Sequence, residues 1–224
     1  MTVALICAMP MELKPLVKKL GLKSEGKRKV GDGVVAIYTG MGTELATNST
    51  DALLDAVPDI ERVVVFGITG GINNDQPIAS LIVPEIVRNS ETGEEFKPHS
   101  FNGHTPKGTM WTTNVMTPAH EYPGMIERGV ISLDMETAAI AKCCEARGIP
   151  WSVYRTISDN PSDNIDDEVF KMGNQDGSYN PGRIIKYFLR HPGAIPHMIR
   201  LGRGAFKATD AASDAAISAL RNDG

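Results

Sequence analysis

Three acidic residues each follow a predicted strand in this chain: Glu12, Glu136 and Asp159. The C-terminal ends of parallel strands meet at one edge of a sheet, so we expect the three carboxyl groups to share a crevice. One carboxylic acid can protonate a leaving group while a second carboxylate activates water or steadies a cationic sugar, which is the chemistry of glycosidic cleavage. Carboxylates follow strands in many proteins, however, so the spacing alone leaves the reaction undecided.

Residues 129–160 are the stretch around which the rest of the chain is organised. The pattern predicts a strand that ends at Asp134 and Glu136, then an Ala-rich helix closed by Gly148, then a strand that ends at Ser158 and Asp159. Open α/β sheets bind ligands beyond the carboxyl ends of their strands. This stretch therefore predicts a small-molecule site.

Earlier apolar runs predict the other strands of the sheet, over residues 2–8, 33–39, 62–67 and 79–87. After the first, Pro15 suggests that the regular helix begins only around Lys14. Residues 68–72, which include Thr69 and Gly70, are expected to form a glycine turn whose backbone N–H groups suit an anion or a hydroxyl. Pro84 suggests an edge or a bulge in the last of these strands.

Several common sites are excluded by spacing. The glycines at 40 and 42 lack the third small residue of a dinucleotide fingerprint, and no Lys-Ser/Thr pair completes a phosphate loop after residue 71. The histidines are not at metal-ligand spacing, and the acidic run 163–168 does not match a calcium loop. We therefore expect neither a metal nor a cofactor.

The composition limits which kinds of binding partner and which cellular compartment we expect. With 224 residues, 42% of them hydrophobic, the chain can bury a large core, and its net charge of −4 provides no basic footprint for nucleic acid. Cys7 and the pair Cys143 and Cys144 form neither a disulfide framework nor a metal knuckle. No signal peptide and no apolar run of about 18 residues is present, so we expect no integral membrane segment and a cytoplasmic location.

The last 46 residues form a separate region in this interpretation. We divide the chain into a catalytic domain, 1–178, and a helical extension, 179–224, packed on or near it. Helices are predicted from Gly182 to Arg190 and from His197 to Leu220. The second helix is either a surface helix packed on the domain or a basic amphipathic segment that approaches a membrane or covers an apolar ligand.

Five segments stand in a recognisable order along residues 1–165. They are Ala8-Met9 with Glu12, Thr39 to Gly42, Phe66 to Gly71, Leu133 to Ala141, and Arg155 to Asp159. Together they resemble the motifs of the nucleoside phosphorylase and nucleosidase superfamily, most closely those of the 5′-methylthioadenosine/S-adenosylhomocysteine nucleosidases.

The resemblance implies a three-layer α/β/α sandwich with a twisted mixed sheet, in a homodimer or a higher homo-oligomer. It implies a purine nucleoside as ligand, with Asp159 protonating or hydrogen-bonding purine N7, Glu136 accepting the ribose hydroxyls, and Met135 lying under the sugar. Glu12 would activate water, held with help from the backbone around Thr69. We also place Asp134, Gly70, Ser158, Val115 and Met116 among the substrate-binding residues.

The resemblance leaves the reaction open between hydrolysis and phosphorolysis. A phosphorylase normally binds phosphate with arginine side chains, but no arginine stands in the first glycine turn, and Arg88, the only candidate near the second, could equally be a surface residue. Hydrolysis of a 5′-substituted adenosine such as methylthioadenosine or adenosylhomocysteine is therefore our first choice. A phosphorylase, with phosphate as co-substrate, is the alternative. A nucleoside-binding protein without catalysis is the third.

Two segments depart from the nucleosidase pattern. Asn114-Val115-Met116 stands where these enzymes carry Asp-x-Phe, which leaves the aromatic partner of the purine unassigned. The tail is similar to the Arg/Pro-containing tails of hopanoid-associated phosphorylases, whose substrate carries a large apolar 5′ group. A nucleoside with a lipid-like 5′ group is therefore the leading alternative substrate.

Overall fold

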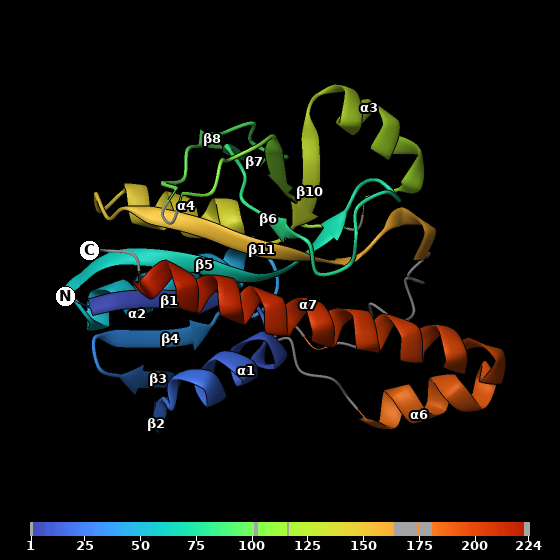
Figure 1. Cartoon of the computed structure of the whole chain (residues 1–224), viewed down its shortest axis with the longest axis horizontal. Coiled ribbons are helices and arrows are strands. Elements are labelled where there is room, and N and C mark those ends of the chain that lie inside the picture. The colour runs from blue at the N-terminus through green and yellow to red at the C-terminus, as the bar shows by residue number, and fades with distance from the viewer. Residues whose placement is uncertain (1, 101–102, 116, 164–173, 175–180, 222–224) are drawn as a thin grey trace.

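The computed structural model describes the chain except residues 1, 101–102, 116, 164–173, 175–180 and 222–224. Its centre is a mixed sheet with helices on both faces, as expected from the sequence (Figure 1). The strands are β1 (Thr2–Cys7), β2 (Lys23–Glu25), β3 (Arg28–Gly31), β4 (Val34–Tyr38), β5 (Ile60–Gly71), β6 (Leu81–Ile82), β7 (Ile86–Asn89), β8 (Glu95–Phe96), β9 (Thr109–Thr112), β10 (Val130–Asp134) and β11 (Trp151–Asp159).

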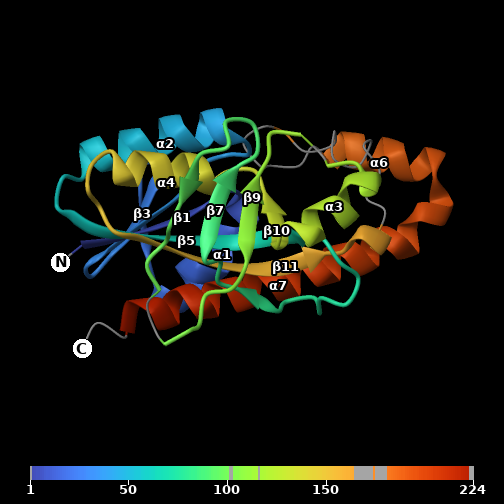
Figure 2. The same cartoon turned by 90° about the horizontal axis from the view of Figure 1, so that it is seen from above.

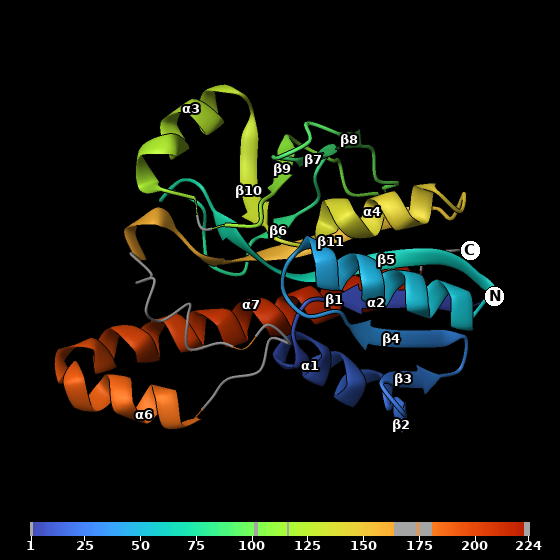
Figure 3. The ribbon, with the colours of Figure 1, turned by 180° about the vertical axis from the view of Figure 1, so that it is seen from behind.

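The helices form the two outer layers. Helices α2 and α4 cover one face of the sheet, and α1 and α7 cover the other (Figure 2). Seen from behind, α2 and α4 lie side by side (Figure 3). The α-helices are α1 (Pro10–Leu20), α2 (Thr43–Ala56), α3 (Tyr122–Glu127), α4 (Thr137–Glu145), α6 (Pro181–Arg190) and α7 (Ile195–Arg221), with 3₁₀ turns η1 (Ala119–Glu121), η2 (Pro161–Asp163) and η3 (Pro192–Ala194).

Strand β5 is the centre of the sheet and is buried on both faces. Val63 and Val65 pack into the cluster under α2 and α4, while Val64 and Phe66 pack into the cluster under α1 and α7. This alternation follows from the two-residue period of a strand. Each such side chain contributes about 1.5–3 kcal/mol when it is removed from water.

The sheet splits along one edge of β5. Strand β1 pairs with β5 in parallel as far as Val65, and β10 pairs with it antiparallel only at Gly70 and Gly71. Strand β11 runs in parallel along β5 and reaches Gly70 through Asp159. Between Val65 and Gly70, the described strands leave this edge of β5 without a partner strand, so side chains reach its backbone there.

Two expectations for the glycine-rich and proline-containing segments are wrong. Residues 68–71 are not a turn but the end of β5, because β10 and β11 both pair with this part of the strand. Helix α1 begins at Pro10 rather than near Lys14, because proline is favourable at the first helical position and the Glu12 side chain accepts the N–H of Met9.

The expected strand over residues 79–87 forms two short strands, β6 and β7. Pro84 lies between them and cannot donate a backbone hydrogen bond. The backbone N–H groups of Glu85 and Ile86 both donate to the carbonyl of Gly108 instead.

Helix α7 supplies part of the core. Its second half packs the small side chains of Ala208, Ala212 and Ala216 against the sheet and α1. The Thr156 hydroxyl of β11 donates to the carbonyl of Ala208 at 2.6 Å. The division at residue 178 stays a prediction, but residues 208–219 belong to one of the two helical layers. Each helix in the described part of the chain lacks the length or the hydrophobicity that crossing a bilayer requires.

Candidate active site

Glu12 lies completely buried where β1 and β10 separate. Its Oε2 accepts the N–H groups of Ala8 and Met9 at 2.9 and 2.7 Å, and its Oε1 accepts that of Ile68 at 2.7 Å. A carboxylate has about four acceptor positions, so about one remains free, on Oε1. Burial raises the pKa of Glu12 against the opposing effects of Arg155 and the three N–H groups.

Glu136 precedes α4 and lies beside the same opening. Its Oε1 accepts the N–H of Gly42 at 3.0 Å, and its Oε2 lies 3.4 Å from a terminal nitrogen of Arg155. About two acceptor positions therefore remain for a ligand. Burial raises the pKa of Glu136 to about 7, and nearby Asp134 and Glu12 also raise it.

Arg155 links the buried acids from β11. Its guanidinium donates to the Ile68 carbonyl at 2.8 Å and forms an ion pair with Asp134 at 2.8 Å, besides its contact with Glu136. Its Nε donates to the Thr137 hydroxyl at 3.1 Å. One cation thus faces three carboxyl groups, those of Asp134, Glu136 and Glu12, and burial raises the pKa of Glu12 and of Glu136 despite this cation.

Asp134 is occupied by protein groups. Its Oδ2 accepts from the backbone and hydroxyl of Thr137 and from Arg155, and its Oδ1 accepts from the Thr112 hydroxyl at 2.6 Å. These contacts hold the start of α4 and orient Arg155. They give Asp134 a positioning role, and its predicted contact with substrate gains no support from them.

Asp159 ends β11 and, unlike Glu12, is only partly buried. Burial raises the pKa of its carboxyl group, nearby Asp163 raises it further, and a hydrogen bond from the Ser158 hydroxyl opposes these effects. Burial also raises the pKa of Tyr122, and the charge of Asp159 raises it further. The pKa of the Asp159 carboxyl group is therefore above that of an ordinary aspartic acid.

Thr69 connects the strand that carries Asp159 with the strand that leads to Glu136. Its hydroxyl donates to the carbonyl of Leu133 at 2.7 Å, and its own carbonyl accepts from the Ser158 hydroxyl at 3.3 Å. Next along β5, Gly70 pairs with both Leu133 and Asp159. Asp159, the last residue of β11, and Glu136, two residues after the end of β10, therefore both lie near the end of β5 that these strands flank.

For the other predicted substrate-binding residues, the structure gives only how far each side chain is exposed. Met135 is half-buried between Asp134 and Glu136, whereas Val115 is 70% exposed. Met116 lies outside the described residues.

Arg88, the predicted candidate for phosphate, is engaged elsewhere. It pairs with Glu95 at 2.6 Å and its guanidinium lies 5.9 Å from the ring centre of Trp111. Neither of these contacts involves Glu12, Glu136 or Asp159.

Sequence reasoning missed two groups that shape the site. Arg155 was the only basic residue in a predicted buried strand that ends in an acid, a signal that it pairs with buried carboxylates. Asn114 accepts from the backbone and hydroxyl of Thr43 at 3.1 and 2.9 Å, which holds the start of α2 next to Gly42. No local pattern indicated that contact.

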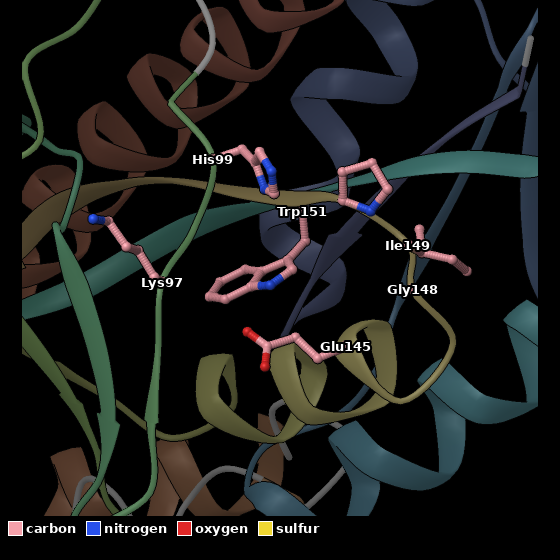
Figure 4. A pocket seen from close by; sticks show the side chains of 7 residues that line it. Lys97, His99, Glu145, Gly148, Ile149 and Trp151 are labelled. Atoms are coloured by element: carbon pink, nitrogen blue, oxygen red, sulfur yellow. The ribbon is translucent and has the colours of Figure 1, made fainter.

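A separate open pocket lies at the other end of β11, where Trp151 begins that strand (Figure 4). None of the three predicted acids lines it. Its lining residues are Lys97, His99, Glu145, Gly148, Ile149, Pro150 and Trp151. Among the residues that the structure describes, no group of His, Cys, Asp and Glu side chains is arranged to hold a metal ion.

The fold and the family comparison define the class of protein. The model of the phosphorylase superfamily matches residues 2–119 and 101–190. The chain belongs to this superfamily, and it is an enzyme that cleaves nucleosides, a nucleosidase or a phosphorylase.

Solved structures with the same fold include two enzymes from Helicobacter pylori. A mutant 5′-methylthioadenosine nucleosidase with 5′-methylthioadenosine in its active site is 14% identical, with a TM-score of 0.70 over 98% of this chain and 97% of that one. Futalosine hydrolase is 15% identical, with a TM-score of 0.71 over the same shares.

The 5′-methylthioadenosine/S-adenosylhomocysteine nucleosidase of Colwellia psychrerythraea, in complex with adenine, is 20% identical. Its TM-score is 0.70 over 98% of this chain and 94% of that one.

Proposed function

We propose that this enzyme hydrolyses the N-glycosidic bond of a purine nucleoside with a substituent at the 5′ position. The observation that carries the proposal is that a partly exposed Asp159 and a buried Glu136 both lie near the last residues of β5, where Thr69 bonds to Leu133 and to Ser158, close neighbours of these acids in the chain. One carboxyl group is suited to donate a proton and the other to accept hydrogen bonds. Adenosine with a 5′-thio substituent is the first substrate to test, because nucleosidases for such compounds share the fold.

Asp159 acts as the general acid in this mechanism. Its raised pKa keeps the carboxyl group protonated when that of an ordinary aspartic acid would be ionised. Transfer of this proton to N7 withdraws electrons from the bond between the base and C1′, so the base leaves as a neutral molecule. The sugar then carries positive charge at the reacting carbon.

Glu136 binds the sugar and stabilises that charge. Its two free acceptor positions match the two adjacent ribose hydroxyls, while Arg155 and Gly42 fix its orientation. Binding requires the ionised form, because a protonated carboxyl group loses an acceptor. The negative cluster also favours a cationic sugar over a neutral one.

Glu12 activates the nucleophile. It has one free acceptor position on Oε1, beside the open edge of β5, and a raised pKa that makes it a stronger base than an ordinary glutamate. Water suits this environment better than phosphate does. Arg155 is already bound to two carboxylates, and uncompensated carboxyl groups would repel an anion.

Product analysis separates hydrolysis from phosphorolysis. The enzyme would be incubated with methylthioadenosine, adenosylhomocysteine, adenosine and inosine, each with and without phosphate. We expect free adenine and a free sugar without phosphate. Formation of a sugar 1-phosphate only when phosphate is present would establish the phosphorylase alternative, including one for a large apolar 5′ group.

Asp159→Asn tests the acid. We expect kcat to fall by roughly 10²–10⁴-fold, because the amide cannot transfer a proton, with ligand affinity largely retained. Asp75→Asn, at an exposed position, is the control. Unchanged turnover in the Asp159 variant would show that Asp159 is not the general acid. If the wild-type protein binds nucleosides but cleaves none of them, it is a nucleoside-binding protein.

A further inference from the structure

Residues 181–207 form a basic helical hairpin made of α6, η3 and the first half of α7. Figure 1 shows this hairpin projecting beyond the layered part of the molecule. Although the whole chain has a net charge of −4, residues 177–209 contain none of its 27 Asp and Glu residues. The hairpin contains six Lys and Arg residues: Arg183, Lys186, Arg190, Arg200, Arg203 and Lys207.

Large apolar side chains are exposed along one face of α7 in this hairpin. Ile195, Ile199 and Phe206 are 38%, 50% and 68% exposed. They are four and seven residues apart, and this spacing places them on one stripe of a helix. Arg203 and Lys207 are exposed on the same stretch of helix. The buried face of α7, which includes Ala208 and Ala212, is a different one.

We propose that the basic hairpin docks on a lipid bilayer with anionic headgroups. A helix with exposed apolar residues and basic neighbours lies in the membrane–water interface. Its apolar side chains insert among the acyl chains, while Lys and Arg contact the headgroups. Charge complementarity selects this partner. A second copy of the same face would bring the exposed Arg203 and Lys207 against their like-charged counterparts, and nucleic acid would leave the isoleucines and the phenylalanine in water.

The docking surface adjoins the candidate active site. Gly204 of α7 lies against the backbone carbonyl of Ser158, where an added Cβ would lie 3.3 Å from that oxygen. One turn earlier, Arg200 forms an ion pair with Asp163 at 2.9 Å, and Asp163 raises the pKa of Asp159. Docking would therefore hold the end of β11 near the bilayer. This suits a nucleoside with an apolar 5′ group, a consequence that rests on the proposed function.

Vesicle co-sedimentation of the full chain tests the docking itself and needs no substrate. We expect binding to vesicles of phosphatidylcholine with phosphatidylglycerol, little binding to phosphatidylcholine alone, and weaker binding as salt increases. Arg203→Glu with Lys207→Glu should weaken binding by roughly 25-fold or more, because each basic residue near an anionic surface contributes about fivefold. Ile199→Ser with Phe206→Ser should weaken it at every salt concentration.

The matched control is Lys23→Glu with Lys27→Glu. It makes the same charge change at exposed positions in β2 and in the turn that follows β2, outside the basic hairpin. Thermal unfolding would confirm that all variants are folded. The proposal is overturned if neutral vesicles bind equally well, if the control loses as much binding as the hairpin variant, or if duplex DNA displaces the vesicles. A hairpin variant that converts a dimer to a monomer, with no vesicle binding by the wild-type protein, would assign the face to a second copy instead.

Discussion

Asp159 has a pKa that is raised by burial and by a charged neighbour, Asp163, that other residues position. Asp163 faces it from η2, accepts the N–H of Asn160 at 2.8 Å and is in turn paired with Arg200. The charge of Asp163 disfavours ionisation of Asp159, and Arg200 partly compensates that charge. The protonation of the candidate acid thus depends on a pair of residues outside the reacting groups.

Asp163→Asn should move the alkaline limb of kcat/KM to lower pH. Removing the negative neighbour lowers the pKa of Asp159, and an acid catalyst is lost as the pH rises through its pKa. Arg200→Gln should move the same limb in the opposite direction, because the charge of Asp163 is then uncompensated. Two shifts of the same sign in the pH profiles would contradict this arrangement.

Glu136→Gln should increase thermal stability above about pH 7 although it removes nucleoside binding. The pKa of Glu136 is raised from 4.5 to about 7, so the folded state binds more protons than the unfolded state between these values. Stability then falls as the pH rises through this window, by about 3 kcal/mol in total, because the pKa difference of about 2.5 corresponds to about 1.4 kcal/mol for each pH unit. Gln removes this cost because it does not ionise.

Unfolding at a series of pH values measures the effect. The difference between Glu136→Gln and the wild-type protein should be small below about pH 4.5 and reach its full size above about pH 7. Glu145→Gln, at an exposed position, is the control. A difference that does not change with pH would show that burial does not disfavour the charge at residue 136.

At the scale of elements, the split in the sheet creates the site. A continuous pairing of β5 would hide the backbone groups of Ile68, whereas the gap between β1 and β10 lets Glu12 and Arg155 reach them. Gly67 borders this gap with a φ of +136°, a conformation that other residues rarely adopt. A Cβ at this position would clash with the Glu12 carboxylate.

Gly67→Ala should therefore lower both activity and stability. The strained backbone costs about 1–3 kcal/mol, and displacement of Glu12 should reduce kcat by at least about tenfold. Gly148→Ala is the matched control, since its φ is +65° and no atom lies within 4 Å of an added Cβ. That variant should lose stability alone. Equal activity in both variants would show that the position of Glu12 does not limit turnover.

At the scale of the whole molecule, the chain closes its core with its last helix. Helix α7 packs on β5, β11 and α1, and Arg62 of β5 donates to the carbonyl of Ala219 at 2.9 Å. Small residues allow this close approach of helix and sheet. We therefore propose that residues 208–219 fold as part of the catalytic domain, while the preceding basic hairpin has a separate role.

Ala212→Leu should destabilise the protein by about 1–3 kcal/mol, because Ala212 is 1% exposed and the added atoms have no space. Ser218→Leu places the same side chain on the exposed face of α7 and should change stability little. Denaturant unfolding measures both. Similar small effects would mean that the helix packs loosely and that the predicted division at residue 178 describes the domain better.

The sequence by itself predicted the main buried strands, the helices between them and the acids that follow these strands. The periods of buried strands and helices are local, and acids such as Asp159 stand directly after strands, so a linear pattern predicts both. The expectation of an α/β sandwich of the nucleoside phosphorylase and nucleosidase superfamily is confirmed. The roles of the individual site residues stay predictions.

Only the tertiary structure decided how those acids are held. Glu12 and Ile68 are 56 residues apart along the chain. Helix α4 separates Arg155 from Asp134 and Glu136 in the sequence, yet Arg155 contacts both. Such contacts depend on which strands pair and where the sheet splits, and no local pattern records either. For the same reason, the glycines after residue 67 suggested a turn until β10 and β11 were seen to pair with them from both sides.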